Sequence, residues 1–329
     1  MHNHRAKRLI GFILLGFILF LIGNRVDDLR LYQGASVAMY VIGIASIVLL
    51  TGFSGQISLG NGAIMALGGF SATLAQSTWG LPLPLTFVVA VLGAALFGSI
   101  LGVAAARLSG PYLAGATLAL AVALPSLANQ FTFLGGEQGL PFDSGSAPTF
   151  LGEDFSRFKW FYWISALAAL LMTWLISNVL QSRFGRSWRA VRSNSTAAEL
   201  VGIHSARSKV LAFTLASGVA GLAGAVLALN LGGVSPSAYP LSLSFALITG
   251  AVLAGISTLS GSVIGALLLV GMSELVGSLT SRFSLEDVLA ENLKELLVSV
   301  LLILAVVFTP NGPGDRIRGR KALHKKLNN

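Results

Sequence analysis

Long apolar stretches recur along almost the whole of this 329-residue chain, and they limit the folds open to it. The core of a lipid bilayer is about 30 Å thick, and a helix crosses it with roughly 20 apolar residues, within a range of about 17–25. The sequence therefore predicts an all-α polytopic membrane protein. Its bundle would have about ten transmembrane helices, over residues 9–23, 32–51, 61–78, 85–106, 112–132, 160–180, 210–231, 241–256, 262–277 and 293–309.

The composition excludes the soluble and disordered classes of protein. Hydrophobic residues make up 54% of the chain and charged residues 11%, whereas an average soluble protein carries about 25% charged residues. Disordered chains have low hydrophobicity, which is the opposite of this composition. The formal net charge is +9, but the basic residues lie between apolar stretches and form no compact basic face, so no nucleic-acid partner is expected.

The placement of charge predicts the orientation of the chain. Basic residues collect in cytoplasmic loops, and here they gather near the N-terminus, at Arg107, in loop 181–209 and in tail 311–329. With ten spans these four places fall on one side, so both termini are predicted to be cytoplasmic. The whole of 1–329 is then a single transmembrane domain. The basic tail could also attract anionic membrane lipid.

Several chemistries lack the residues that they need. Cysteine is absent, which removes thiolate catalysis and cysteine-ligated metal. The four histidines do not show the spacing of a zinc helix, and no Gly-Lys dipeptide is present for a nucleotide-binding loop. We therefore expect no catalytic residue, no metal site and no cofactor bound by this chain. A membrane enzyme using the acids near 286–295 remains a weaker alternative.

Segment 51–69 is unusually polar and glycine-rich for a membrane span. Non-helical backbone at membrane depth is tolerated only inside protein or beside a water-filled cavity. The segment predicts a broken or re-entrant helix near 52–69, and a close-packed helix crossing is the alternative. The candidate residues of a translocation path are Gln56, Ser58 and Asn61, with Asn129 and Gln130.

A short helix is predicted in the basic loop, in the stretch 184–203. Ser195 or Thr196 could cap a helix over 197–201, and Gly202 could end it. A short helix on a polar loop suits docking into a groove of a soluble partner.

Several motifs together resemble the permease subunit of branched-chain amino acid ABC importers, the LivM type, over roughly residues 45–320. The matching stretches are Gly55–Gly60 (GQISLG), Arg107–Ala114 (RLSGPYLA), Gly135–Leu140, Gly185–Ile203, Lys209–Phe213 with Ala220–Gly224, and Phe308–Gly312 (FTPNG). One departure is Asn61, where the family pattern usually has histidine. The family also includes permeases for urea and short amides.

The resemblance implies a permease of the bacterial inner membrane that is not itself an enzyme. It would pair with a second, similar permease, two cytoplasmic ATPases that bind ATP and Mg, and an extracytoplasmic solute-binding protein. The residues Ala197, Ala198, Glu199 and Gly202 would form the coupling helix that sits on an ATPase. The rival of another class is an ion-driven secondary transporter, for which Glu274 and Glu295 would be the candidate relays.

Overall fold

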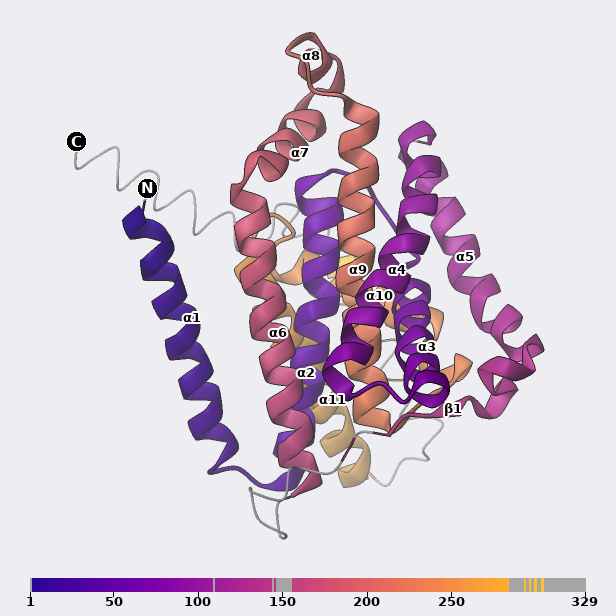
Figure 1. Ribbon diagram of the computed structural model, residues 1–329. Coiled ribbons are helices and arrows are strands. Elements are labelled where there is room, and N and C mark those ends of the chain that lie inside the picture. Colours follow the sequence, from indigo (N-terminus) through magenta and orange to yellow (C-terminus); the bar gives the residue numbers. More distant parts are fainter. Residues whose placement is uncertain are drawn as a thin grey trace.

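The computed structural model of the protein describes residues 2–108, 110–143, 145 and 156–283, together with 293, 296, 299, 300, 303 and 304 (Figure 1). The predicted all-α fold is confirmed, since the described elements are helices apart from two strands of two residues. The α-helices are α1 (His2–Gly23), α2 (Asp28–Ile47), α3 (Asn61–Trp79), α4 (Leu83–Arg107), α5 (Pro111–Gln130), α6 (Arg157–Gln181), α7 (Arg183–Ser193), α8 (Ser195–Leu200), α9 (Ser205–Leu231), α10 (Leu241–Ala254) and α11 (Leu259–Phe283). The shorter elements are the π-helix η1 (Val48–Phe53), the 3-10 helices η2 (Thr132–Leu134), η3 (Gly136–Gln138) and η5 (Pro236–Ala238), and the strands β1 (Leu140–Pro141) and β2 (Gly233–Val234).

Seven of the described helices are long and apolar enough to cross a membrane, so the chain is a multi-pass membrane protein but the count of ten is not supported. The seven are Asp28–Phe53, Leu83–Arg107, Pro111–Gln130, Arg157–Gln181, Ser205–Leu231, Pro236–Ala254 and Leu259–Ser278. The predicted stretch 9–23 lies in α1, whose apolar part is only Gly11–Gly23. The predicted stretch 61–78 is helical in α3, but α3 is not among the seven, because its polar and small residues lower its hydropathy. The predicted stretch 293–309 lies almost wholly outside the described residues.

The prediction of a broken or re-entrant helix near 52–69 is also not supported. The helix that starts at Asp28 continues through η1 to Phe53. A non-helical link over 54–60 follows, and α3 then runs unbroken from Asn61 to Trp79. The polar residues of this segment thus form a connection between two helices and the first turn of the second.

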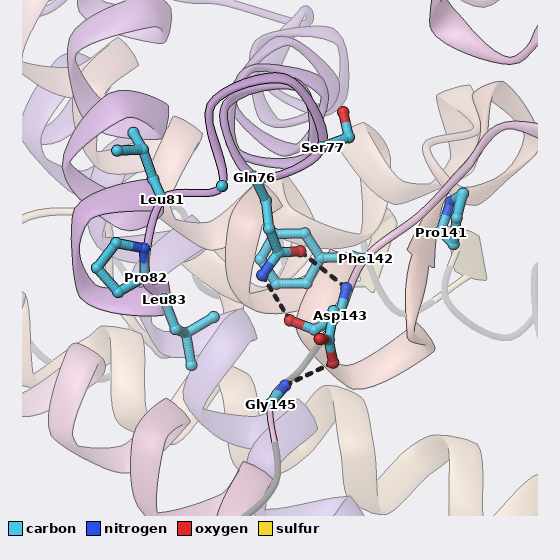
Figure 2. A pocket seen from close by; sticks show the side chains of 10 residues that line it. Gln76, Ser77, Leu81, Pro82, Leu83, Pro141, Phe142, Asp143 and Gly145 are labelled. Carbon is cyan, nitrogen blue, oxygen red and sulfur yellow. Dashed lines mark hydrogen bonds between the residues drawn. The ribbon is translucent and has the colours of Figure 1, made fainter.

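The ends of the bundle differ in character. At one end, which Figure 1 shows at the bottom, β1 pairs antiparallel with β2 and Leu140 lies opposite Val234. There Gln76 of α3 exchanges two hydrogen bonds with the backbone of Asp143, at 2.7 and 2.8 Å (Figure 2). These groups border a cavity of about 560 Å³. The opposite end carries the projecting pair α7 and α8.

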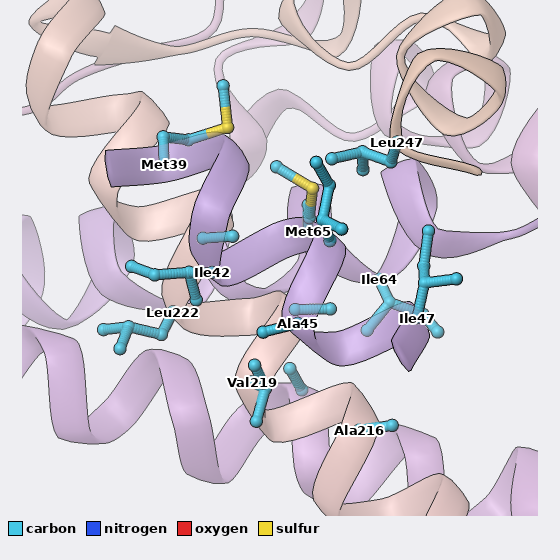
Figure 3. Packing of buried hydrophobic residues seen from close by; sticks show 14 of the residues in the cluster. Met39, Ile42, Ala45, Ile47, Ile64, Met65, Ala216, Val219, Leu222 and Leu247 are labelled. Carbon is cyan, nitrogen blue, oxygen red and sulfur yellow. The ribbon is translucent and has the colours of Figure 1, made fainter. Parts of the chain in front are cut away.

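The core lies where α2, α3 and α9 meet. Large apolar side chains of these helices and of α10 interdigitate there, among them Met39, Ile42, Met65, Val219, Leu222 and Leu247 (Figure 3). Glycines bring α3 and α9 into backbone contact: a Cβ on Gly68 would collide with the backbone of Gly221, and one on Gly224 with that of Met65. Because helices in lipid associate through close packing of small residues, this contact fixes the position of α3, and with it the position of the polar segment before it.

Candidate functional site

Helix α7 is amphipathic and lies against the first turn of α9. Its buried residues Gly185, Trp188 and Val191 recur every third position, which places them on one helix face. Trp188 is 1% exposed, and its indole N–H donates to the carbonyl of Ser208 at 3.0 Å. This tryptophan therefore anchors the basic loop to a transmembrane helix.

Helix α8 spans Ser195–Leu200, and the expected cap at Ser195 or Thr196 is wrong. The Asn194 side chain caps the helix instead, because its Oδ1 accepts the N–H of Ala197 at 3.0 Å. The expected end of the helix is confirmed. Gly202 has a φ of +83°, its N–H donates to Glu199 at 2.9 Å, and the N–H of Ile203 donates to Ala198 at 3.0 Å.

The four predicted coupling residues come together on α8 and the turn after it. Ala198 is buried, whereas Ala197 and Gly202 are exposed. Glu199 is exposed as well, and its carboxylate accepts a hydrogen bond from the hydroxyl of Ser205. The same tip carries two apolar side chains that the sequence analysis did not single out, Leu200 at 86% exposed and Val201 at 75%. An apolar tip beside a carboxylate is a surface that can enter a groove on a protein partner.

The predicted pathway residues Gln56, Ser58 and Asn61 are buried in the bundle. The amide of Asn61 donates to the hydroxyl of Ser46 on α2 at 2.6 Å. The hydroxyl of Ser58 accepts the N–H of Gly60 at 3.3 Å. In the described structure these side chains bond within the protein, and their place on a translocation path stays a prediction.

Gln56 differs from its neighbours because half of its amide lacks a partner. Its Nε2 donates to the Ser54 hydroxyl at 2.6 Å and to the Lys209 carbonyl at 3.1 Å. Its Oε1 is buried and accepts no hydrogen bond within the described part of the chain. A buried acceptor without a donor costs free energy, so this oxygen keeps a free capacity to accept a hydrogen bond.

Helix α7 contacts the segment 52–61 through two of its arginines. The Arg192 guanidinium donates to the backbone carbonyl of Gly52. Its side chain covers Gly55, where a Cβ would lie 2.8 Å from the Arg192 Cγ. The Arg189 guanidinium lies over the ring of Phe53, 5.9 Å from its centroid. With the bond from Gln56 to Lys209, these contacts join the loop 181–209 to the segment 52–61.

Asn129 and Gln130 are not brought together with the other three predicted pathway residues. Both are exposed near the end of α5. Asn129 lines a cavity of about 650 Å³ with Glu137 of η3 and Ser237 of η5. Since η3 precedes β1 and η5 follows β2, this cavity lies at the end of the bundle away from α7.

The carboxylates give no further site. Among the residues that the structure describes, no group of three or more histidine, aspartate or glutamate side chains could hold a metal ion. Glu274, a candidate relay of the ion-driven alternative, is exposed on α11, and Glu295 lies outside the described residues.

Comparison with known proteins gives a match along most of the chain. The sequence model of the family described as "Branched-chain amino acid transport system / permease component" matches residues 31–306. The "High-affinity branched-chain amino acid transport system permease protein LivM" of Escherichia coli K12 is 27% identical over 298 residues, which cover 83% of this chain and 67% of that protein. The permease protein BraD of Pseudomonas aeruginosa, described in the same words, is 31% identical over 49% of this chain and 48% of its own length. The "Autoinducer 2 import system permease protein LsrC" of Salmonella paratyphi B is 39% identical over 37% of this chain and 34% of its own length.

Proposed function

Because this chain belongs to the family of branched-chain amino acid transport system permease components, we propose that it is the membrane-spanning subunit of an ATP-binding cassette importer. In this proposal a second, similar permease completes the pore and an extracytoplasmic binding protein delivers the solute. Two ATPases bind ATP and Mg and drive alternating access. The chain itself supplies the path and the contact to an ATPase, and it does no chemistry.

The observation that carries the proposal is the attachment of α7 and α8 to the polar segment. The tip of α8 presents Leu200, Val201 and Glu199 outward. The base of the same loop holds Gly52 and Gln56 through Arg192 and Lys209. A movement that an ATPase imposes on α8 would therefore reach the link between α2 and α3 through few, direct contacts, which is what coupling requires.

The proposed topology has ten crossings, with α1, α3 and 293–309 added to the seven helices above. Both termini, loop 181–209 and tail 311–329 are then cytoplasmic, in the bacterial inner membrane. The grouping of Arg192, Lys209 and Arg107 at one end supports this orientation. Reporter fusions after residues 26, 108, 145, 194 and 329 test it. A reporter that works only in the cytoplasm should be active after residues 108, 194 and 329 and inactive after residues 26 and 145.

The proposed substrate is a branched-chain amino acid. Urea and short amides remain the alternative from the resemblance, and the similarity to LsrC adds autoinducer 2 to the solutes worth testing. A panel of leucine, isoleucine, valine, urea, acetamide and autoinducer 2, offered with the binding protein, would rank them by uptake.

The experiment that tests the function is uptake by the purified complex in proteoliposomes. We expect uptake that requires both ATPases and ATP in the compartment that they face. This uptake should persist in the presence of ionophores. Uptake without the ATPases that collapses with an ion gradient would instead establish the secondary transporter.

A further inference from the structure

A groove opens between the C-terminal end of α4 and the first turns of α9. It has a volume of about 530 Å³ and lies at the same end of the bundle as α7. Seven residues line it: Val103, Ala106, Arg107, Ala206, Arg207, Val210 and Leu211. Five of them are apolar and the other two are arginines, so the groove combines an apolar wall with a basic rim.

The groove forms near the ends of α4 and α9, where these closely packed helices no longer fill the space between them. Deeper in the bundle the two helices touch, since a Cβ on Gly102 would lie 3.1 Å from the Val210 Cα. Toward the helix ends the facing residues Ala106 and Ala206 are too small to fill the space. Val103 is 53% exposed and Leu211 is 44% exposed, so apolar surface is open along the groove.

The two guanidiniums at the rim have no carboxylate to neutralise them within the described residues. Arg107 and Arg207 are both exposed. None of the residues that line the groove is acidic. Glu199, the acid closest to Arg207 in the sequence, accepts a hydrogen bond from Ser205. Arg107 is the last residue of the apolar helix α4 and Arg207 lies in the first turn of the apolar helix α9, and the ends of such helices are where a span meets the polar headgroups.

We propose that this groove is a binding site for one anionic phospholipid, with Arg107 and Arg207 on its phosphodiester and an acyl chain along Val103 and Leu211. Guanidinium groups bind phosphate oxygens in a fork of two hydrogen bonds. Basic pockets between transmembrane helices bind anionic headgroups. The apolar wall favours a lipid over a free phosphate ion, because the ion would leave Val103 and Leu211 exposed to water. This site uses none of the coupling residues, so it stands independently of the proposed function.

The site is tested by native mass spectrometry of the full-length protein with phosphatidylglycerol or phosphatidylcholine of identical acyl chains. We expect the wild type to retain one phosphatidylglycerol molecule in preference to phosphatidylcholine. Each basic residue near the headgroups contributes about 1 kcal/mol, so the double variant R107Q/R207Q should retain phosphatidylglycerol about 30-fold more weakly. The matched control R25Q/R30Q removes two exposed arginines from the other end of the bundle and should retain it normally.

A second variant separates the groove from simple surface charge. A206W fills the groove and keeps both arginines, and it should lose the retained lipid as well. Equal retention by R107Q/R207Q and the wild type would overturn the proposal, and so would unchanged retention by A206W. Displacement of the lipid by excess inorganic phosphate would identify a phosphate site instead. If R107Q/R207Q lost ATPase co-purification but retained the lipid normally, the groove would be a protein contact instead.

Discussion

Arg192 on α7 donates a hydrogen bond to the backbone carbonyl of Gly52, 140 positions earlier in the sequence. Gly52 lies at the end of η1, and the last carbonyls of a helix lack partners within it and carry partial negative charge. An arginine of the loop 181–209 therefore completes the end of a transmembrane helix. This contact ties the loop 181–209 to the segment 52–61.

Replacing Arg192 should loosen the link between α2 and α3. A hydrogen bond to a charged group contributes about 1.5–3 kcal/mol, so R192Q is expected to speed amide exchange at Ser54 and Gln56 about 10-fold or more. Hydrogen–deuterium exchange measures this directly. The control is R186Q, because Arg186 lies on the same helix but, among the described residues, donates only to the nearby Gln181 carbonyl, at 3.3 Å. Equal exchange in the two variants would contradict the link.

Asn194, and not the serine after it, should set the stability of α8. Loss of a helix cap costs about 1 kcal/mol, so N194A should raise the exchange rate of the Ala197 amide about fivefold. S195A should leave that rate unchanged, since the Asn194 side chain makes the capping bond. A larger effect of S195A than of N194A would refute this assignment of the cap.

Gly202 should be required for the proposed contact with an ATPase. A left-handed backbone costs a residue with a side chain about 1–2 kcal/mol, so G202V should misdirect Leu200 and Val201 and reduce ATPase co-purification several-fold. Gly80 offers a matched control, because it has a φ of +61° and nothing within 4 Å of its Cβ position among the described residues. G80V carries the same strain at the other end of the bundle and should leave co-purification intact. Equal losses in both variants would point to general misfolding.

The contact between α3 and α9 should tolerate no added methyl group. A Cβ on Gly224 would collide with the Met65 carbonyl, whereas one on Gly115 of α5 meets nothing within 4 Å in the described structure. Overpacking costs about 1–3 kcal/mol, so G224A should lower the unfolding temperature in detergent. G115A should leave it equal or higher, because alanine favours helix. An unchanged unfolding temperature of G224A would show that the two helices are not in contact.

The borders of some spans were well predicted from the sequence, although their number was not. The stretches 85–106 and 160–180 agree with α4 (Leu83–Arg107) and α6 (Arg157–Gln181) to within three residues. Apolar length predicts these borders closely, because lipid thickness selects it. The stretch 293–309 cannot be compared in the same way, since most of it lies outside the described residues.

The polar segment was harder to predict because its bonding partners are distant in the sequence. The N–H of Leu59 binds the Thr117 hydroxyl at 2.9 Å, and that of Gly62 binds the Ser244 hydroxyl at 2.8 Å. A segment rich in glycines and hydroxyls resembles a broken helix when only its neighbours in the chain are considered. No local pattern reveals which helix supplies the partner.

Two details of the loop 181–209 were equally hard to predict from the sequence. Asn194, Ser195 and Thr196 are all good capping residues, and only the end of α7 at Ser193 decides that Asn194 takes the role. The arginines of α7 recur at every third position, which does indicate a basic helix face. No sequence pattern indicates the acceptor of Arg192, which is a carbonyl 140 residues away.

We propose that ATP hydrolysis in the partner ATPases is coupled to the translocation path through the hydrogen bond from Arg192 to Gly52. The most direct measurement is the number of ATP molecules hydrolysed per solute imported, in proteoliposomes that contain the complete complex. We predict that R192Q keeps its ATPase activity and hydrolyses about tenfold more ATP per solute, while R186Q matches the wild type. The same ratio in R192Q and the wild type would contradict the claim.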